Sequence, residues 1–138
     1  AALAKGLFAA IHRAIDAGLV RACHDLSEGG LAVALAEMAF AGGLGAWIEL
    51  DDMPFALTGD FLDLPADVYL FSESNTRFLC EVPMQNAAAF ETALASLPYA
   101  RLGEVTDRAT LEILADNATV LSAGISTLKE AWQKPLRW

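Results

Sequence analysis

The stretch His24-Asp25-Leu26-Ser27-Glu28-Gly29-Gly30-Leu31 decides the fold, because an apolar strand changes into a helix there. The apolar run over residues 19–23 predicts a buried strand that ends just before it. Over residues 28–40 the apolar side chains return at helical spacing, which predicts a helix that ends at a pair of glycines. An acid, a hydroxyl and two glycines are therefore expected at the connection between a strand and a helix.

Such a corner is suited to phosphate and metal ions. The first N–H groups of a helix lack partners within the helix, and its dipole presents a positive end to an anion. Asp25 is a candidate ligand for a cation, Ser27 is a candidate to bind a ligand oxygen, and Gly29 and Gly30 would let the backbone approach a phosphate closely. A second interpretation stays open, in which Asp25 or Ser27 only caps the helix and the glycines only permit a tight turn.

Composition limits the classes of function. A chain of 138 residues predicts one compact domain, and no apolar stretch is long enough to cross a membrane. The formal net charge of −9 argues against nonspecific nucleic-acid binding. A phosphorylated ligand would therefore need local donors or a bridging Mg²⁺.

The cysteines and the N-terminus bear on the compartment. Cys23 and Cys80 each lie in an apolar segment without metal-ligand spacing, so we expect buried, reduced thiols, and a disulfide between them stays open. The chain shows no secretory signal, which favours a cytoplasmic protein. It begins with Ala1 rather than Met, so we also consider processing or excision from a longer chain.

The remaining periodicities predict a mixed sheet covered by helices, in the α+β class, with four or more strands. In the strand at 46–50, Ala46, Ile48 and Leu50 should face inward and Trp47 should meet another layer. We expect an irregular connection or short helical turns over 51–66, a turn at Asp116-Asn117 and a disordered tail after Gln133. The other expected elements are helices at 3–17, 83–97 and around Leu128 and Trp132, a helical turn at 68–71, and strands at 78–82, 100–105 and 110–114.

A second polar cluster, Phe71-Ser72-Glu73-Ser74-Asn75-Thr76-Arg77, lies in a predicted loop just ahead of a strand. Arg77 has the planar fork that holds a phosphate, and Glu73 can accept hydrogen bonds from ribose hydroxyls or amine groups. The alternative is an internal Glu73–Arg77 ion pair that ties the loop down.

Together the two clusters resemble those of the phosphoribosylformylglycinamidine synthases, in the C-terminal domain that they share with aminoimidazole ribonucleotide synthases. The residues that carry the resemblance are the run from Ala22 to Ala39 and the motif Phe71-Ser72-Glu73-Ser74 followed by Arg77-Phe78. The resemblance covers essentially the whole chain. It implies a single C-terminal domain over residues 1–138 that belongs to a longer enzyme.

The resemblance implies an ATP-dependent ligase of purine biosynthesis, which converts formylglycinamide ribonucleotide to an amidine with ammonia from glutamine. It implies Mg²⁺ and ATP or ADP as cofactors. The implied partners are the N-terminal domains, a glutaminase subunit and a small accessory subunit. Asp25 resembles a Mg²⁺ ligand, and Ser27, Gly29 and Gly30 belong to the nucleotide motif. The residues that resemble a substrate-binding loop are Glu73, Ser74, Asn75 and Arg77.

The resemblance assigns no catalytic residue to this chain. His24 does not match the catalytic histidine of the family, and His12 is expected to be solvated. The fragment alone should therefore lack turnover. Two alternatives stay open, namely a domain of another ATP-using relative (selenophosphate synthetase, thiamine-monophosphate kinase or a hydrogenase maturation protein) and a purely structural or interaction domain.

Overall fold

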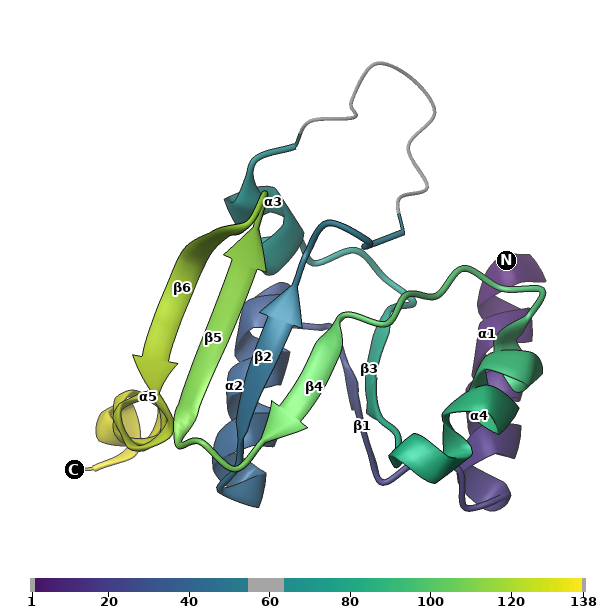
Figure 1. Cartoon of the computed structure of the whole chain (residues 1–138), viewed down its shortest axis with the longest axis horizontal. Coiled ribbons are helices and arrows are strands. Elements are labelled where there is room, and N and C mark those ends of the chain that lie inside the picture. The colour runs from purple at the N-terminus through teal and green to yellow at the C-terminus, as the bar shows by residue number, and fades with distance from the viewer. Residues whose placement is uncertain (1, 55–63, 138) are drawn as a thin grey trace.

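The computed structural model describes residues 2–54 and 64–137. Helices and strands alternate over the first part of the chain, and three consecutive strands then precede the last α-helix (Figure 1). In chain order the elements are α1 (Ala2–Asp16), β1 (Ala22–Asp25), α2 (Gly30–Gly42), β2 (Gly45–Glu49), α3 (Ala66–Phe71), β3 (Phe78–Glu81), the 3₁₀ turn η1 (Met84–Asn86), α4 (Ala87–Leu94), β4 (Gly103–Thr106), β5 (Thr110–Ala115), β6 (Ala118–Gly124), α5 (Ile125–Gln133) and the 3₁₀ turn η2 (Lys134–Leu136).

Four strands form a mixed sheet in the order β4-β2-β5-β6. β2 runs antiparallel to β4 and parallel to β5, and β5 runs antiparallel to β6. Ile48 of β2 lies opposite Ile113 of β5, and both side chains are buried. α2 packs behind this sheet (Figure 1), where Leu31 and Leu35 join the same core cluster. The expected α+β class with a mixed, helix-covered sheet is confirmed.

β1 and β3 form a separate two-stranded antiparallel ribbon rather than extending the main sheet. α1 and α4 pack beside it in a second apolar cluster, in which Ala10, Ile11 and Leu94 contact Phe78 and Cys80 of β3. Within residues 2–54 and 64–137, the buried apolar side chains thus form two cores of unequal size. The ribbon lies between them and carries both sequence clusters at one of its ends.

Several sequence expectations need correction. β6 was not predicted, because its sequence from Ala118 to Gly124 is rich in small and polar residues. The disordered tail expected after Gln133 is instead the turn η2, held by ion pairing between Arg137 and Glu130 with N···O distances of 2.7 and 2.8 Å. Trp47 does not meet a second layer within residues 2–54 and 64–137, since it is 36% exposed on the uncovered sheet face. The connection predicted at 51–66 lies mostly outside the described residues.

Candidate functional site

The two sequence clusters meet at one end of the β1–β3 ribbon. The backbone N–H of Leu26, just after β1, donates to the carbonyl of Arg77, just before β3, with an N···O distance of 3.0 Å. The N–H of Gly29 donates to Oε1 of Glu73 at 2.8 Å. The structure therefore brings the Asp25–Gly30 corner and the 72–77 loop into one site, although 44 positions separate Gly29 from Glu73 in the sequence.

Both glycines of the corner are required by the backbone. Gly29 has φ 78° and Gly30 has φ 63°, in the left-handed region that favours glycine. A Cβ on Gly30 would lie 2.7 Å from the carbonyl oxygen of Leu70 and 2.8 Å from that of Ser72. Gly30 therefore lets the start of α2 approach the backbone that enters the 72–77 loop. The close approach that this glycine permits is to another segment of the protein.

The start of α2 is capped by an anion from the other cluster. The N-cap residue is Gly29, which offers no side chain, so neither Asp25 nor Ser27 fills this position. The Glu73 carboxylate accepts from the Gly29 N–H instead. A negative group already lies at the positive end of the helix, where the sequence predicted a bound phosphate.

Asp25 and Ser27 remain accessible. The Asp25 side chain is 66% exposed at the end of β1, and its nearest ion-pair partner is Nδ1 of His24 at 3.8 Å. Ser27 is exposed, and its carbonyl accepts a hydrogen bond from the N–H of Gly30 at 3.2 Å, which closes the turn. The carboxylate and the hydroxyl are thus both presented to solvent beside the helix start.

Arg77 holds the 72–77 loop by a backbone contact. Its Nη2 donates to the carbonyl of Ser72 at 2.7 Å, so in place of the Glu73–Arg77 ion pair, the alternative considered from the sequence, each side chain bonds to a backbone group. Burial lowers the pKa of Arg77, and its Nε is buried without a hydrogen-bond partner in the described chain. Ser74 and Asn75 are exposed at the loop tip.

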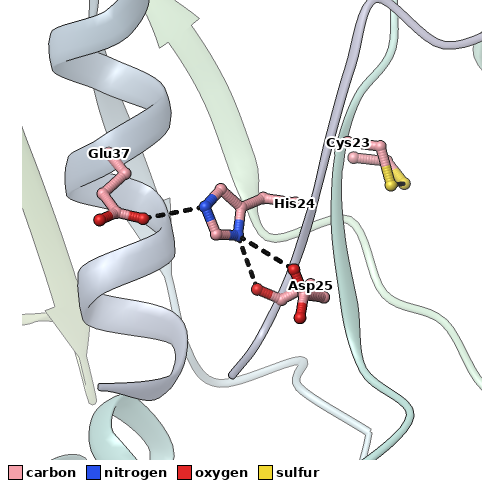
Figure 2. A network of polar contacts seen from close by, with 5 residues as sticks. Cys23, His24, Asp25 and Glu37 are labelled. Carbon is pink, nitrogen blue, oxygen red and sulfur yellow. Dashed lines mark hydrogen bonds and ion pairs between the residues drawn. The ribbon is translucent and has the colours of Figure 1, made fainter. Parts of the chain in front are cut away.

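A polar network beside the corner was missed by sequence reasoning. Nδ1 of His24 contacts the carbonyl of Asp25 at 2.6 Å, and Nε2 contacts Oε2 of Glu37 at 2.9 Å (Figure 2). Since a carbonyl and a carboxylate both accept, the protonated imidazolium would donate to both at once, and this arrangement favours the charged form. The bond to the Asp25 carbonyl, with a smaller contribution from Glu37, raises the pKa of His24. Nε1 of Trp132 donates to Oε1 of Glu37 at 2.8 Å, which links α5 to the same network.

A signal for part of this network was present in the sequence. Glu37 lies on the otherwise apolar helix α2, where a lone acid needs a partner. The hydrogen bond between Glu37 and Trp132 could not be predicted from periodicity, because 95 positions separate them in the sequence.

Both cysteines are free thiols, as expected. The expectation that both are buried was wrong. Cys23 is exposed and Cys80 is half-buried, because a two-stranded ribbon has no flanking strand to cover it. A hydrogen bond from the Cys80 thiol lowers the pKa of Cys23 to about 7. The same interaction, with burial, raises the pKa of Cys80.

The donors that this part of the chain offers fit Mg²⁺ only in combination with a ligand. The described residues contain no group of three or more His, Cys, Asp and Glu side chains able to enclose a metal ion. Mg²⁺ commonly takes one or two carboxylates and completes its shell with water and substrate phosphates. The exposed Asp25 carboxylate suits that mode, and a nucleotide would supply the remaining oxygens.

Two hollows lie away from this site, on the uncovered face of the main sheet. Their volumes are about 280 and about 620 Å³, and both are lined by Trp47 and Glu104. None of the predicted site residues lines either hollow. Among the described helices, none is long and apolar enough to cross a membrane.

Known proteins resemble this chain in both sequence and structure. The chain is 43% identical over 124 residues to the phosphoribosylformylglycinamidine synthase subunit PurL of Deinococcus radiodurans, which covers 89% of this chain and 16% of that protein. It superposes on Thermotoga maritima PurL complexed with ATP with a TM-score of 0.81 and 26% identity, over 90% of this chain and 21% of the other. The hydrogenase maturation protein HypE shares the fold alone, with a TM-score of 0.62 at 21% identity, over 80% of this chain and 39% of the other.

The chain thus spans about a sixth of the length of its curated relative. Residues 1–116 match the family described as "AIR synthase related protein, C-terminal domain". That match covers α1 to β5, including both sequence clusters and the site that they form. This chain therefore belongs to the family of AIR synthase related C-terminal domains.

Proposed function

We propose that this chain serves as the C-terminal domain of a PurL-type phosphoribosylformylglycinamidine synthase subunit, an ATP-dependent ligase of purine biosynthesis. The observation that carries the proposal is the 43% identity over 124 residues to such a subunit, which runs through both clusters. Their meeting at one end of the β1–β3 ribbon supports a single ligand site. The cytoplasm is then the expected compartment, in keeping with two free thiols.

Within the proposal, Asp25 holds Mg²⁺ against the phosphates of ATP or ADP, and Ser27 with the Gly29 and Gly30 backbone contacts the nucleotide. Mg²⁺ supplies charge neutralisation at those phosphates when bound. This matters because the chain carries a net charge of −9, which repels an anionic ligand. A phosphate at the Gly29 N–H would take the place of the Glu73 carboxylate, so nucleotide binding would release Glu73 from its present bond.

The released loop would then serve the phosphoribosyl substrate. Glu73, Ser74 and Asn75 lie in the loop, and all three are exposed. Arg77 anchors the loop at its base through Ser72. T. maritima PurL has been solved with ATP, with ADP and with FGAR, and it occurs in a PurLQS complex. We accordingly propose a glutaminase subunit and a small accessory subunit as partners, with the N-terminal domains of the same enzyme.

The first test is a chimera in which this chain replaces the matching segment of D. radiodurans PurL. We expect ATP- and ammonia-dependent conversion of formylglycinamide ribonucleotide at a rate within about tenfold of the parent. Asp25→Ala in the chimera should lower kcat/KM by at least about a hundredfold if the carboxylate holds Mg²⁺. The matched control is Asp107→Ala, an exposed acid of the β4–β5 turn, which should leave the rate unchanged.

A folded chimera without turnover would contradict the proposed enzyme, whereas an active chimera insensitive to Asp25→Ala would contradict only the metal assignment. Calorimetric titration of Mg²⁺-ADP into the 138-residue chain then asks whether this domain binds nucleotide by itself. Saturable heat that Asp25→Ala abolishes would support a retained site. The isolated chain should show no turnover in either case, because most of the enzyme is absent.

A further inference from the structure

Cys23 and Cys80 lie directly opposite each other in the antiparallel β1–β3 ribbon. Their Sγ atoms are 3.7 Å apart, although 57 positions separate them in the sequence. Figure 2 shows the Cys23 sulfur pointing away from His24, on the other side of the ribbon from Glu37. The pair therefore lies on the opposite face of the ribbon from the His24–Glu37 contact, whereas Asp25, two residues after Cys23 in β1, is on the same face as the pair.

This placement satisfies the geometric requirement for a disulfide. Directly opposed residues of an antiparallel pair have Cα atoms about 4.5–5.5 Å apart. That range lies within the span of about 4.4–6.8 Å that disulfides bridge. The sulfurs need to approach from 3.7 Å to a bond length of about 2.05 Å, which side-chain rotation supplies without moving the strands.

We propose that Cys23 and Cys80 form a reversible disulfide site that is oxidised by low-molecular-weight disulfides such as glutathione disulfide. Cys23 is the exposed thiol and reacts first. Its thiolate attacks one sulfur of the small disulfide, forms a mixed disulfide and releases one small thiolate.

The half-buried Cys80 completes the reaction. Its thiolate attacks the Cys23 sulfur, forms the Cys23–Cys80 bond and expels the second small thiolate. The two protons from the protein thiols end on the two small thiols. Two protein thiols are thus oxidised while one small disulfide is reduced, and excess small thiol reverses both steps.

The bond would staple the ribbon close to the candidate site. Cys23 lies two residues before Asp25, and Cys80 lies three residues after Arg77. Oxidation would therefore fix the base of both ligand loops relative to each other. Because the crosslink closes a long loop, we expect the melting temperature to rise by about 5–15 °C.

The experiment incubates the 138-residue chain with mixtures of reduced and oxidised glutathione, followed by thiol blocking and tryptic mass mapping. No Lys or Arg occurs between Ala22 and Thr76, so trypsin separates peptide 22–77 from peptide 78–101. The expected product is these two peptides joined by one disulfide, in a monomer by non-reducing electrophoresis. Excess reduced glutathione should restore both free peptides.

The matched variants are Cys23→Ser and Cys80→Ser, each checked for folding by circular dichroism. Cys80→Ser should accumulate a glutathione adduct on Cys23, Cys23→Ser should react at least about tenfold more slowly, and neither should gain thermal stability with oxidant. A stable glutathione adduct on Cys23 of the unsubstituted chain, without the joined peptides, would overturn the proposal. Disulfide-linked dimers in place of the internal bond would overturn it as well.

Discussion

At the scale of single residues, Gly30 shows how the site depends on the absence of a side chain. Gly30→Ala should lower the free energy of unfolding by about 2–4 kcal/mol, because its φ is positive and the new Cβ meets two carbonyl oxygens. The matched control is Gly42→Ala in the same helix, where a Cβ meets nothing within 4 Å. It should stabilise by about 0.5–1 kcal/mol, and urea unfolding distinguishes the two. Equal effects at both positions would contradict the structure.

His24 should make stability depend on pH. Since its folded pKa is raised above the ordinary 6.5, the folded state binds the proton more tightly than the unfolded chain. The stabilisation is complete below the unfolded value and is lost as the pH rises through the folded one. Melting temperatures measured in EDTA from about pH 5.5 to about pH 8.5 should therefore fall more for the parent than for His24→Gln. Glu37→Gln should reduce the slope while its amide oxygen still accepts from Trp132. Parallel curves for parent and His24→Gln would rule this account out.

At the scale of elements, the β5–β6 hairpin is closed by Asp116 and Asn117, both with positive φ (51° and 59°). Glycine adopts this conformation more easily, so Asn117→Gly should stabilise the chain by about 0.5–1 kcal/mol. Asn117→Val should destabilise it by about 1–2 kcal/mol, because a β-branched side chain is disfavoured there. Thermal unfolding checks the order Gly, Asn, Val, and any other order would show that the turn is built differently.

This hairpin also shows where sequence reasoning stops. The turn was predicted from Asp116 and Asn117, whose side chains suit it, but the strand after it was missed because small and polar residues carry no clear alternation. The burial of Ile48 in β2 and of Leu50 just after it was predicted correctly, because these residues follow the two-residue period of a strand. Periodicity reports which face of an element is buried. It does not report which element pairs with which.

The same limit applies to the site. The corner around Asp25 and the loop around Glu73 were each recognised from local chemistry, but their meeting in one site was not predicted. The bond from Gly29 to Glu73 depends on the tertiary fold, so no spacing rule predicted it. The Cys23–Cys80 pairing is similar, because it follows from the register of β1 against β3.

At the scale of the whole molecule, a destabilising substitution in one apolar cluster should affect a larger part of the chain than a substitution in the other. The larger contains the fully buried Leu111 and Ile113, and the smaller contains Leu94 between α1 and α4. Ile113→Ala should cost about 2–5 kcal/mol and speed amide hydrogen exchange throughout the chain. Leu94→Ala should speed exchange mainly in α1 and α4 and leave β5 protected. A uniform increase in the second variant would mean that the two clusters unfold as one.

The bond between the Gly29 amide and the Glu73 carboxylate also bears on how such a domain can evolve. An insertion or deletion in either loop would move one partner away from the other and leave the start of α2 without its anion. A change in the length of one loop is therefore tolerated only when the other loop changes with it. Grafting one loop from a distant relative should disrupt the domain, and grafting both should preserve it.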